Sequence, residues 1–431
     1  MRYSFNPRIL PRERLRSKAI FGVVLAVILC APLSLRADPS QTLTLQDAMS
    51  LALRYNPGVV ANEAQRQAAR AGERTAAAYP NPVVEAGAGP TIYRDGRNGV
   101  NNNWGVGISQ PIDYPALRAS RIRGAEAGTG AAQAGLQAFQ MNLLAEVKAA
   151  FYDVIRRREE RQIAGEDLSL LEQVRERVKV RVDTGEAPRY ELIKADAERL
   201  NARKILQSAE IRVTQSKALL SRLIGPEFRE DFEVAGELSA SREVPPLEKL
   251  REEVIAGNPA MAQSRAEQMR ARARLNTERE LSIPQVALKA GIDQDPDLQN
   301  WRLGVAVVVP FWNRREGPIA EAAAGVNQVD AQAEQRKLGL LRDLDTAYNQ
   351  YLINLSQVSA YEGGLLAQAE AALNVAGAAY RFGERGILDY LDAQRVYRQV
   401  RLDFLNARFD LQLSWIEIQR LRASDLPGST P

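Results

Sequence analysis

The chain has 431 residues, a formal net charge of +4, one cysteine and no histidine. The lack of histidine excludes serine–histidine and cysteine–histidine catalysis and histidine-based metal sites, and a single cysteine excludes a disulfide within the chain. Aromatic residues make up only 6% of the chain, which favours long helices with small contact residues over a dense globular core.

Residues 1–37 have the pattern of a secretory signal peptide. Six basic residues within 2–18 precede an apolar run at 19–35, and the small Ala37 precedes the expected cleavage site. Removing this segment leaves 50 basic and 52 acidic residues, a net charge of −2, so no nucleic-acid partner is expected. A lipid-anchored Cys30 is the alternative, although the residue before it is not small.

The rest of the chain contains one pattern twice. Asn56-Pro57 recurs as Asn258-Pro259, 202 residues later, and Gly185-Glu186 recurs as Gly383-Glu384. A series of matches in the same order indicates an internal repeat. The predicted parts are a first repeat at 38–224, a linker at 225–246, a second repeat at 247–421 and a flexible tail at 422–431.

Each repeat is expected to contain a short helix, a longer helix, two strands, a very long helix and a last helix. The helices of the first repeat are predicted at 45–55, 58–78, 115–182 and 188–224. Those of the second repeat are predicted at 247–257, 260–281, 317–380 and 387–421. The last helices carry apolar residues at alternating spacings of three and four, which is typical of a coiled-coil seam. No strands are predicted outside the two pairs.

The four predicted strands alternate apolar residues with small or polar ones, the period of a strand with two different faces. The apolar face is predicted to meet lipid and to consist of Val84, Ala86, Ile92, Trp104, Val106, Ile108, Val286, Leu288, Ile292, Trp301, Leu303 and Val305. Strands of about 9–11 residues are long enough to cross a bilayer at a tilt. Four strands cannot close a barrel, so several copies must share theirs. The alternative is a soluble sheet that covers a core.

At this point the sequence resembles the TolC family of outer membrane efflux proteins. The resemblance is carried by both Asn-Pro pairs, by Ser109-Gln110-Pro111 and by the segment 380–393. It implies a mainly α-helical chain with a small β part, and a homotrimer in the outer membrane of a Gram-negative bacterium. Four strands per chain would form a 12-stranded barrel, and long coiled-coil helices would form an α-barrel in the periplasm.

The family also implies roles for the turns between the long helices. The residues assigned to the pore gate are Tyr380, Arg385, Asp389 and Asp392. The residues assigned to the turns at the tip, where an adaptor protein would dock, are Gly185, Glu186, Gly383 and Glu384. Residues three apart share one helix face, so three copies would bring six carboxylates to one axis. Acidic residues in a first helical turn are also favoured by the helix dipole alone.

The resemblance implies a passive exit duct that works with a periplasmic adaptor and an inner-membrane pump of the resistance-nodulation-division class. A periplasmic coiled-coil adaptor or scaffold is the alternative function. No catalytic residues, cofactor or metal site are expected, because no nucleophile motif or phosphate loop accompanies the carboxylates. The motifs are most similar to the branch that serves heavy-metal pumps, and drugs are the alternative cargo.

Overall fold

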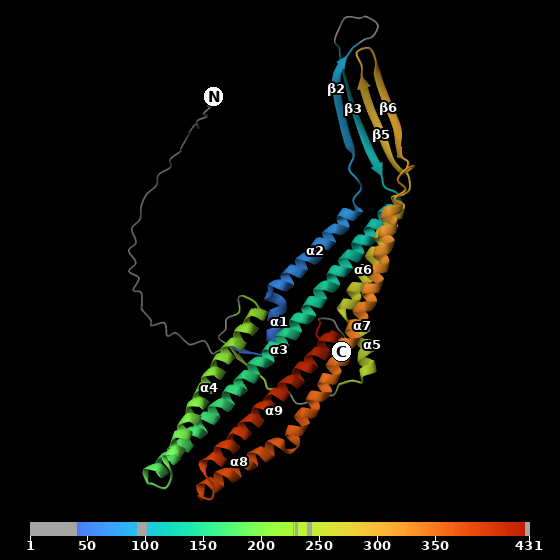
Figure 1. The fold of residues 1–431 in the computed structure, drawn as a ribbon. Helices are drawn as coiled ribbons and strands as arrows, with labels where there is room; N and C mark the ends of the chain where they lie inside the picture. The colour runs from blue at the N-terminus through green and yellow to red at the C-terminus, as the bar shows by residue number, and fades with distance from the viewer. Residues whose placement is uncertain (1–40, 93–100, 227, 229–231, 239–243, 427–431) are drawn as a thin grey trace, which may run out of the picture. The chain divides into compact units, whose positions relative to one another are not determined.

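A computed structural model describes residues 41–92, 101–226, 228, 232–238 and 244–426. The predicted signal peptide, Cys30, part of the first strand loop and residues 427–431 lie outside the described residues. The described chain is mainly helical with a small β part, as expected (Figure 1). None of its helices is long and apolar enough to cross a membrane.

The same order of elements occurs twice along the chain. The first set is α1 (Leu45–Tyr55), α2 (Pro57–Ala77), β2 (Val83–Thr91), β3 (Asn101–Ile112), α3 (Pro115–Asp183) and α4 (Arg189–Ile224). The second set is α5 (Leu247–Gly257), α6 (Pro259–Glu280), β5 (Gln285–Gln294), β6 (Gln299–Val308), α7 (Glu316–Ala360), a π-helical turn (Tyr361–Leu365), α8 (Leu366–Arg381) and α9 (Ile387–Arg422).

The prediction of one very long helix at 317–380 is wrong, because the π-helical turn divides this segment into α7 and α8. Gly364 has a φ of 144°, which lies outside helical geometry. Glycine pairs and π-helical turns are common causes of kinks, and Gly363 and Gly364 are adjacent here. The corresponding helix of the first set, α3, continues without a break for 69 residues, about 100 Å at 1.5 Å per residue.

Two further strands were not predicted. β1 (Gln41–Leu43) and β4 (Phe232–Val234) form a separate parallel pair. Phe232, Val234 and Leu43 are buried in the core cluster around the middle of α3. Strands of three residues are too short for a periodic pattern to reveal them.

The two Asn-Pro pairs connect the beginning of one helix to the end of another. The Asn258 side chain accepts a hydrogen bond from the Ala260 amide at 2.9 Å and donates one to the carbonyl of Leu421, at the end of α9, at 2.8 Å. Asn56 makes the same two bonds, with the Gly58 amide and the Leu223 carbonyl, each at 2.8 Å. Asparagine is a favoured N-cap, and proline suits the first helical position.

Candidate functional site

The larger sheet has the strand order β2-β3-β5-β6, and all its neighbours are antiparallel. Trp104 lies opposite Gln294 and Ile112 lies opposite Val286, so the pairing of β3 with β5 joins the two sets of elements. β2 and β6 are the edge strands, and no described strand pairs with their outer edges. Each edge strand presents a row of unpaired backbone N–H and C=O groups that can pair with a strand of another chain.

One face of this sheet is apolar and open to the surroundings. The residue pairs place Val84 opposite Ile108, Val106 opposite Ile292, and Leu288 opposite Val305. All the predicted apolar positions except Ile92 therefore share this face, and Ile92 lies one residue beyond β2. Trp301 is 78% exposed and Leu303 is 89% exposed. An apolar surface of this kind marks a contact with lipid or protein.

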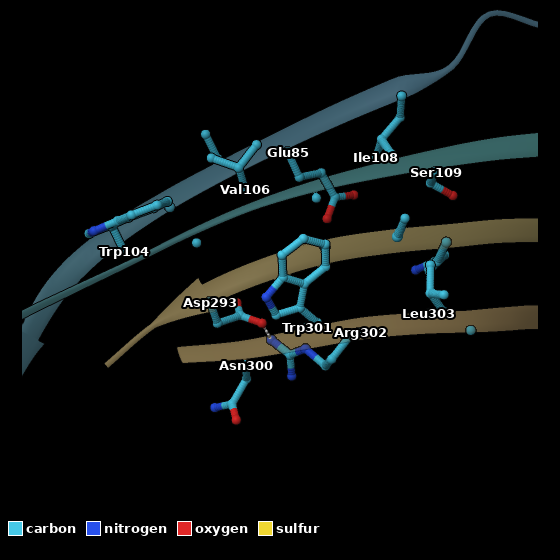
Figure 2. A pocket seen from close by; sticks show the side chains of 18 of the residues that line it. Glu85, Trp104, Val106, Ile108, Ser109, Asp293, Asn300, Trp301, Arg302 and Leu303 are labelled. Carbon is cyan, nitrogen blue, oxygen red and sulfur yellow. Dashed lines mark hydrogen bonds and ion pairs between the residues drawn. The ribbon is translucent and has the colours of Figure 1, made fainter. Parts of the chain in front are cut away.

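The other face carries small and polar residues, among them Gly107, Ser109, Glu85 and Lys289. Arg302 on β6 forms an ion pair with Asp293 on β5 (Figure 2). Backbone and side chains of the sheet line an open hollow of about 1010 Å³. The two faces thus differ in the way expected of a wall between an apolar and an aqueous compartment.

The turn between α3 and α4 and the turn between α8 and α9 have the same backbone structure. Gly185 and Gly383 have φ values of 82° and 77°, which glycine adopts without strain. The Glu186 amide donates to the Arg181 carbonyl at 2.8 Å, and the Glu384 amide donates to the Ala379 carbonyl at 2.9 Å. These bonds define a Schellman motif at each helix end. Each turn therefore has a fixed conformation and leaves its glutamate exposed.

The four residues assigned to a gate divide into two groups. Tyr380 is 5% exposed and stacks on Tyr390 with ring centroids 6.0 Å apart, while the Arg181 guanidinium lies 5.2 Å from its ring centroid. Burial raises the pKa of the Tyr380 hydroxyl, although the Arg181 cation opposes this effect. Tyr380 therefore connects α8 to α9 and α3 within one chain.

The other three residues are exposed, with Arg385 in the turn before α9 and Asp389 and Asp392 in the first turns of that helix. Arg385 and Asp389 form an ion pair at 3.4 Å, and Asp392 lies 3.9 Å from Arg395. The two carboxylates are three residues apart on one helix, so they share a face. Only Arg385 and Asp389 contact one another among the four residues within a single chain.

A ladder of ion pairs between α3 and α9 was not predicted. α3 supplies the acidic residues and α9 the arginines, with Asp167–Arg398 at 3.0 Å, Glu166–Arg401 at 2.7 Å and Glu159–Arg408 at 3.7 Å. The arginines of α9 recur at spacings of three and seven, which places them on one helix face. That stripe is a signal in the sequence, but the acidic partners lie more than 230 residues away.

Asp167 is the buried member of this ladder. Its side chain is 4% exposed, and one carboxylate oxygen, Oδ1, has no hydrogen-bond partner. Burial raises the pKa of Asp167 above its ordinary value, while Arg398 opposes the rise and Glu198 adds to it. The Glu166 carboxylate differs, because Gln162 and Arg401 donate hydrogen bonds to it and lower its pKa.

These shifts predict a pH dependence of stability. The raised pKa means that folded Asp167 binds its proton more tightly than unfolded Asp167, so this stabilisation is present below the unfolded pKa and is lost as pH rises through the folded pKa. Thermal unfolding between pH 3 and pH 7 should show this contribution in wild type and not in Asp167→Asn. Glu166→Gln is the control and should remove the opposite contribution, which is lost as pH falls. Equal pH profiles for wild type and Asp167→Asn would contradict the assignment.

The chain is similar to proteins of known families. The sequence profile described as "Outer membrane efflux protein" matches residues 48–226 and 250–423. The cobalt-zinc-cadmium resistance protein CzcC of Cupriavidus metallidurans is 27% identical over 84% of this chain and 86% of its own length. The nickel-cobalt-cadmium resistance protein NccC of Alcaligenes xylosoxydans is 25% identical over 76% of this chain and 73% of its own.

The fold also matches a solved structure. A crystal structure of CusC, in work on its folding and transmembrane channel formation, has a TM-score of 0.77 and 19% sequence identity, covering 88% of this chain and 91% of that one. The sequence profile matches well over half of the residues, in two segments that each contain one strand pair and its long helices. The chain therefore belongs to the outer membrane efflux protein family.

Proposed function

We propose that three copies of this outer membrane efflux protein form one continuous exit duct. Their strands would close a 12-stranded barrel in the outer membrane, and their helices would continue as an α-barrel in the periplasm. One observation carries the proposal. The first set of elements contacts the second through β3 and α3, but in the described part of the chain the corresponding elements of the second set, β6, α7 and α8, make no matching contacts with the first. β3 pairs with β5, and α3 packs on α6 and α9. Among the described residues β6 pairs only with β5, and α7 and α8 do not pack along α2 or α4.

A neighbouring copy supplies these missing partners in a ring. β6 of one chain would pair with β2 of the next, and α7 and α8 would pack on α2 and α4 of the next. Large apolar side chains are exposed on these four helices and on the π-helical turn between α7 and α8, at Val60, Ile193, Leu200, Ile211, Leu338, Leu352, Leu365 and Val375. A contact of this head-to-tail type closes into a ring when the rotation between copies permits it. Closure requires about eight strands or more, and the family resemblance implies three copies.

The pairing of edge strands can be tested by disulfide cross-linking. Ala88→Cys on β2 is combined in turn with Leu303→Cys, Val305→Cys and Val307→Cys on β6. Opposed residues in antiparallel strands bring Cβ atoms within about 5.5 Å, which permits a disulfide after small adjustments. We expect one of the three pairs to give covalent dimers and trimers on denaturing gels without reductant.

The matched control replaces Ala88→Cys by Ala290→Cys. Ala290 lies on β5, and both edges of that strand are already paired within the chain. A bond from Ala290→Cys to β6 would leave the mass of the polypeptide unchanged. The ring is wrong if all three Ala88 combinations remain monomeric in outer membrane fractions.

At the periplasmic end, the α8–α9 turn is proposed to carry the pore gate. The exposed carboxylates of Asp389 and Asp392 would form two rings around the axis, and Arg385 would bind Asp389 in the closed form. The buried Tyr380 would hold α8 against α9. The exposed Glu186 and Glu384, beside their glycines, would contact the adaptor. Proteins of this family work with an adaptor and an inner-membrane pump, and here we propose a pump of the resistance-nodulation-division class.

Neutralising the proposed rings should change ion selectivity. Rings of carboxylates attract cations and exclude anions, so Asp389→Asn with Asp392→Asn is expected to lower the cation-to-anion permeability ratio by about twofold or more. The loss of Asp389 also frees the positive charge of Arg385. Reversal potentials in planar bilayers measure the ratio. Glu186→Gln with Glu384→Gln removes the same charge outside the proposed rings and should leave the ratio unchanged, whereas equal effects would refute the assignment.

The cargo is proposed to be divalent metal cations. The supporting observation is the similarity to CzcC and NccC, whose names specify resistance to cobalt, zinc, cadmium and nickel. Acidic rings at the entrance would favour such cations over anions. Drug-sized molecules are the alternative cargo.

A further inference from the structure

A short segment between β6 and α7 exposes two aromatic rings. We call residues 309–315 the aromatic elbow. Trp312 is 97% exposed and Phe311 is 69% exposed, and their ring centroids are 6.3 Å apart in an edge-to-face arrangement. Exposed aromatic pairs of this size are costly in water and mark a contact surface.

The conformation of the elbow is fixed by local bonds. The Phe311 amide donates to the Val309 carbonyl at 3.0 Å, and the Asn313 side chain accepts from the Arg315 amide at 3.0 Å. Arg315 has a φ of 59° and donates through Nε to Glu278 of α6 at 3.1 Å. These bonds fix the turn that exposes both aromatic rings.

The corresponding junction of the first repeat, between β3 and α3, is closed. The Tyr114 hydroxyl donates to the Pro284 carbonyl at 2.6 Å, and Asp113 forms an ion pair with Arg121 at 2.7 Å. The aromatic residue of this junction, Tyr114, is thus bound within the chain by its hydroxyl. Of the two described junctions that lead from a strand pair to a long helix, only the second exposes a pair of aromatic rings, so connecting a strand to a helix does not require it.

The elbow continues the apolar face of the sheet. Val305 and Val307 are exposed on that face of β6, and the exposed Val309 and Phe311 follow directly after the strand ends at Val308. Trp301 lies near the other end of β6, seven residues before Val308, which is about 23 Å along the strand. The aromatic residues Trp301 and Phe311 therefore lie toward opposite ends of the apolar face, as the two aromatic girdles of a membrane barrel do.

The elbow also offers complementary charges. Arg314 and Glu316 are exposed and form no ion pair within the described residues. They line an open hollow of about 290 Å³ together with both aromatic rings, Asn313 and Gly317. A guanidinium binds phosphate, and a carboxylate beside an aromatic ring binds an ammonium group. These are the two charges of a phosphoethanolamine headgroup.

We propose that the aromatic elbow binds zwitterionic phospholipid headgroups and anchors the duct at the periplasmic surface of the outer membrane. Phe311 and Trp312 enter the boundary between headgroups and acyl chains. Arg314 binds the headgroup phosphate and Glu316 its ammonium group. The inference rests on the proposed function only in requiring that the apolar face of the sheet lies in lipid.

Fluorescence of Trp312 tests the location. The full chain has four tryptophans, so Trp104, Trp301 and Trp415 are replaced by Phe and the protein is reconstituted in phosphatidylethanolamine–phosphatidylglycerol vesicles. We expect lipids brominated near the headgroup to quench Trp312 at least twofold more than lipids brominated near the chain end. Quenching by aqueous iodide alone, or by neither agent, overturns the proposal, since the first result places Trp312 in water and the second places it under protein.

Two further variants make the result specific. If the variant with all three replacements fails to assemble, the difference in quenching between wild type and Trp312→Phe gives the contribution of Trp312 instead. A variant that retains only Trp301 separates the two inferences: if bromolipids quench Trp301 but not Trp312, the elbow proposal fails while the membrane sheet stands. If neither is quenched, both fail.

Headgroup recognition is measured in detergent. Addition of lysophosphatidylethanolamine should shift Trp312 emission, with apparent affinity reduced at least fivefold in Arg314→Gln. Monoacylglycerol, which lacks the phosphate, should bind at least fivefold more weakly, and inorganic phosphate alone should produce no shift. Equal responses to both lipids, or an unchanged response in Arg314→Gln, would show that the surface does not recognise the headgroup.

Discussion

Val305→Arg is expected to abolish assembly of this protein in the outer membrane, whereas Ala306→Arg is expected to leave most of the assembled protein intact. Val305 lies on the apolar face of β6, opposite Leu288, and Ala306 lies on the small and polar face, opposite Ala287. An arginine on the lipid face near the centre of a barrel strand costs about 2–4 kcal/mol. Three copies in one ring incur that cost together.

The measurement is the amount of heat-modifiable oligomer in outer membrane fractions. The two substitutions add the same charge to adjacent positions of one strand, so expression and folding demands are closely matched. A periplasmic scaffold, the alternative function, would tolerate both changes. Loss of assembly with Ala306→Arg but not with Val305→Arg would reverse the assignment of the two faces.

The faces of the sheet could be predicted from the sequence because their signal is local. Alternation with a period of two assigns Trp104, Val106 and Ile108 to one side of β3 without reference to any other strand. The strand order could not be obtained in this way. The pairing of β3 with β5 joins residues about 180 positions apart, such as Val106 and Ile292, and periodicity carries no information about partners.

Helix ends were predicted better than helix interiors. Glycine after a last helical turn has a specific backbone role, so Gly185 and Gly383 marked both turns correctly. The break at the π-helical turn was missed, although the turn contains the adjacent Gly363 and Gly364. Each glycine in a helix interior costs only about 1 kcal/mol relative to alanine, so the glycine pair alone did not exclude a continuous helix.

The contacts at the candidate site could not be predicted from the sequence. Tyr380 and Asp389 were assigned to a gate through the resemblance, and that role stays a prediction. The stacking of Tyr380 on Tyr390 and the ladder of ion pairs from α3 to α9 depend on the packing of distant helices, which the sequence does not reveal. The Asn-Pro pairs were predicted only in part. Their proline predicted the helix boundary, whereas the bond from each asparagine to the end of the last helix in its repeat required the fold.

Asn258→Leu is expected to lower the free energy of unfolding by about 2–4 kcal/mol per chain. Loss of the N-cap bond to the Ala260 amide costs about 1 kcal/mol. The Leu421 carbonyl also loses the hydrogen bond from the Asn258 side chain, at a residue that is only 1% exposed. An unsatisfied buried polar group costs about 1–3 kcal/mol. Leucine is similar in size to asparagine, so the change removes the two bonds with little loss of volume.

Asn56→Leu is the matched control, because it removes the same two bonds at the corresponding place of the first repeat. Asn56 is only half-buried, so water can replace part of what is lost and the expected destabilisation is smaller. Urea unfolding in detergent, followed by the loss of helical circular dichroism, measures both. If Asn258→Leu unfolds within about 0.5 kcal/mol of wild type, the range typical of surface substitutions, the side chain does not hold α6 to the end of α9.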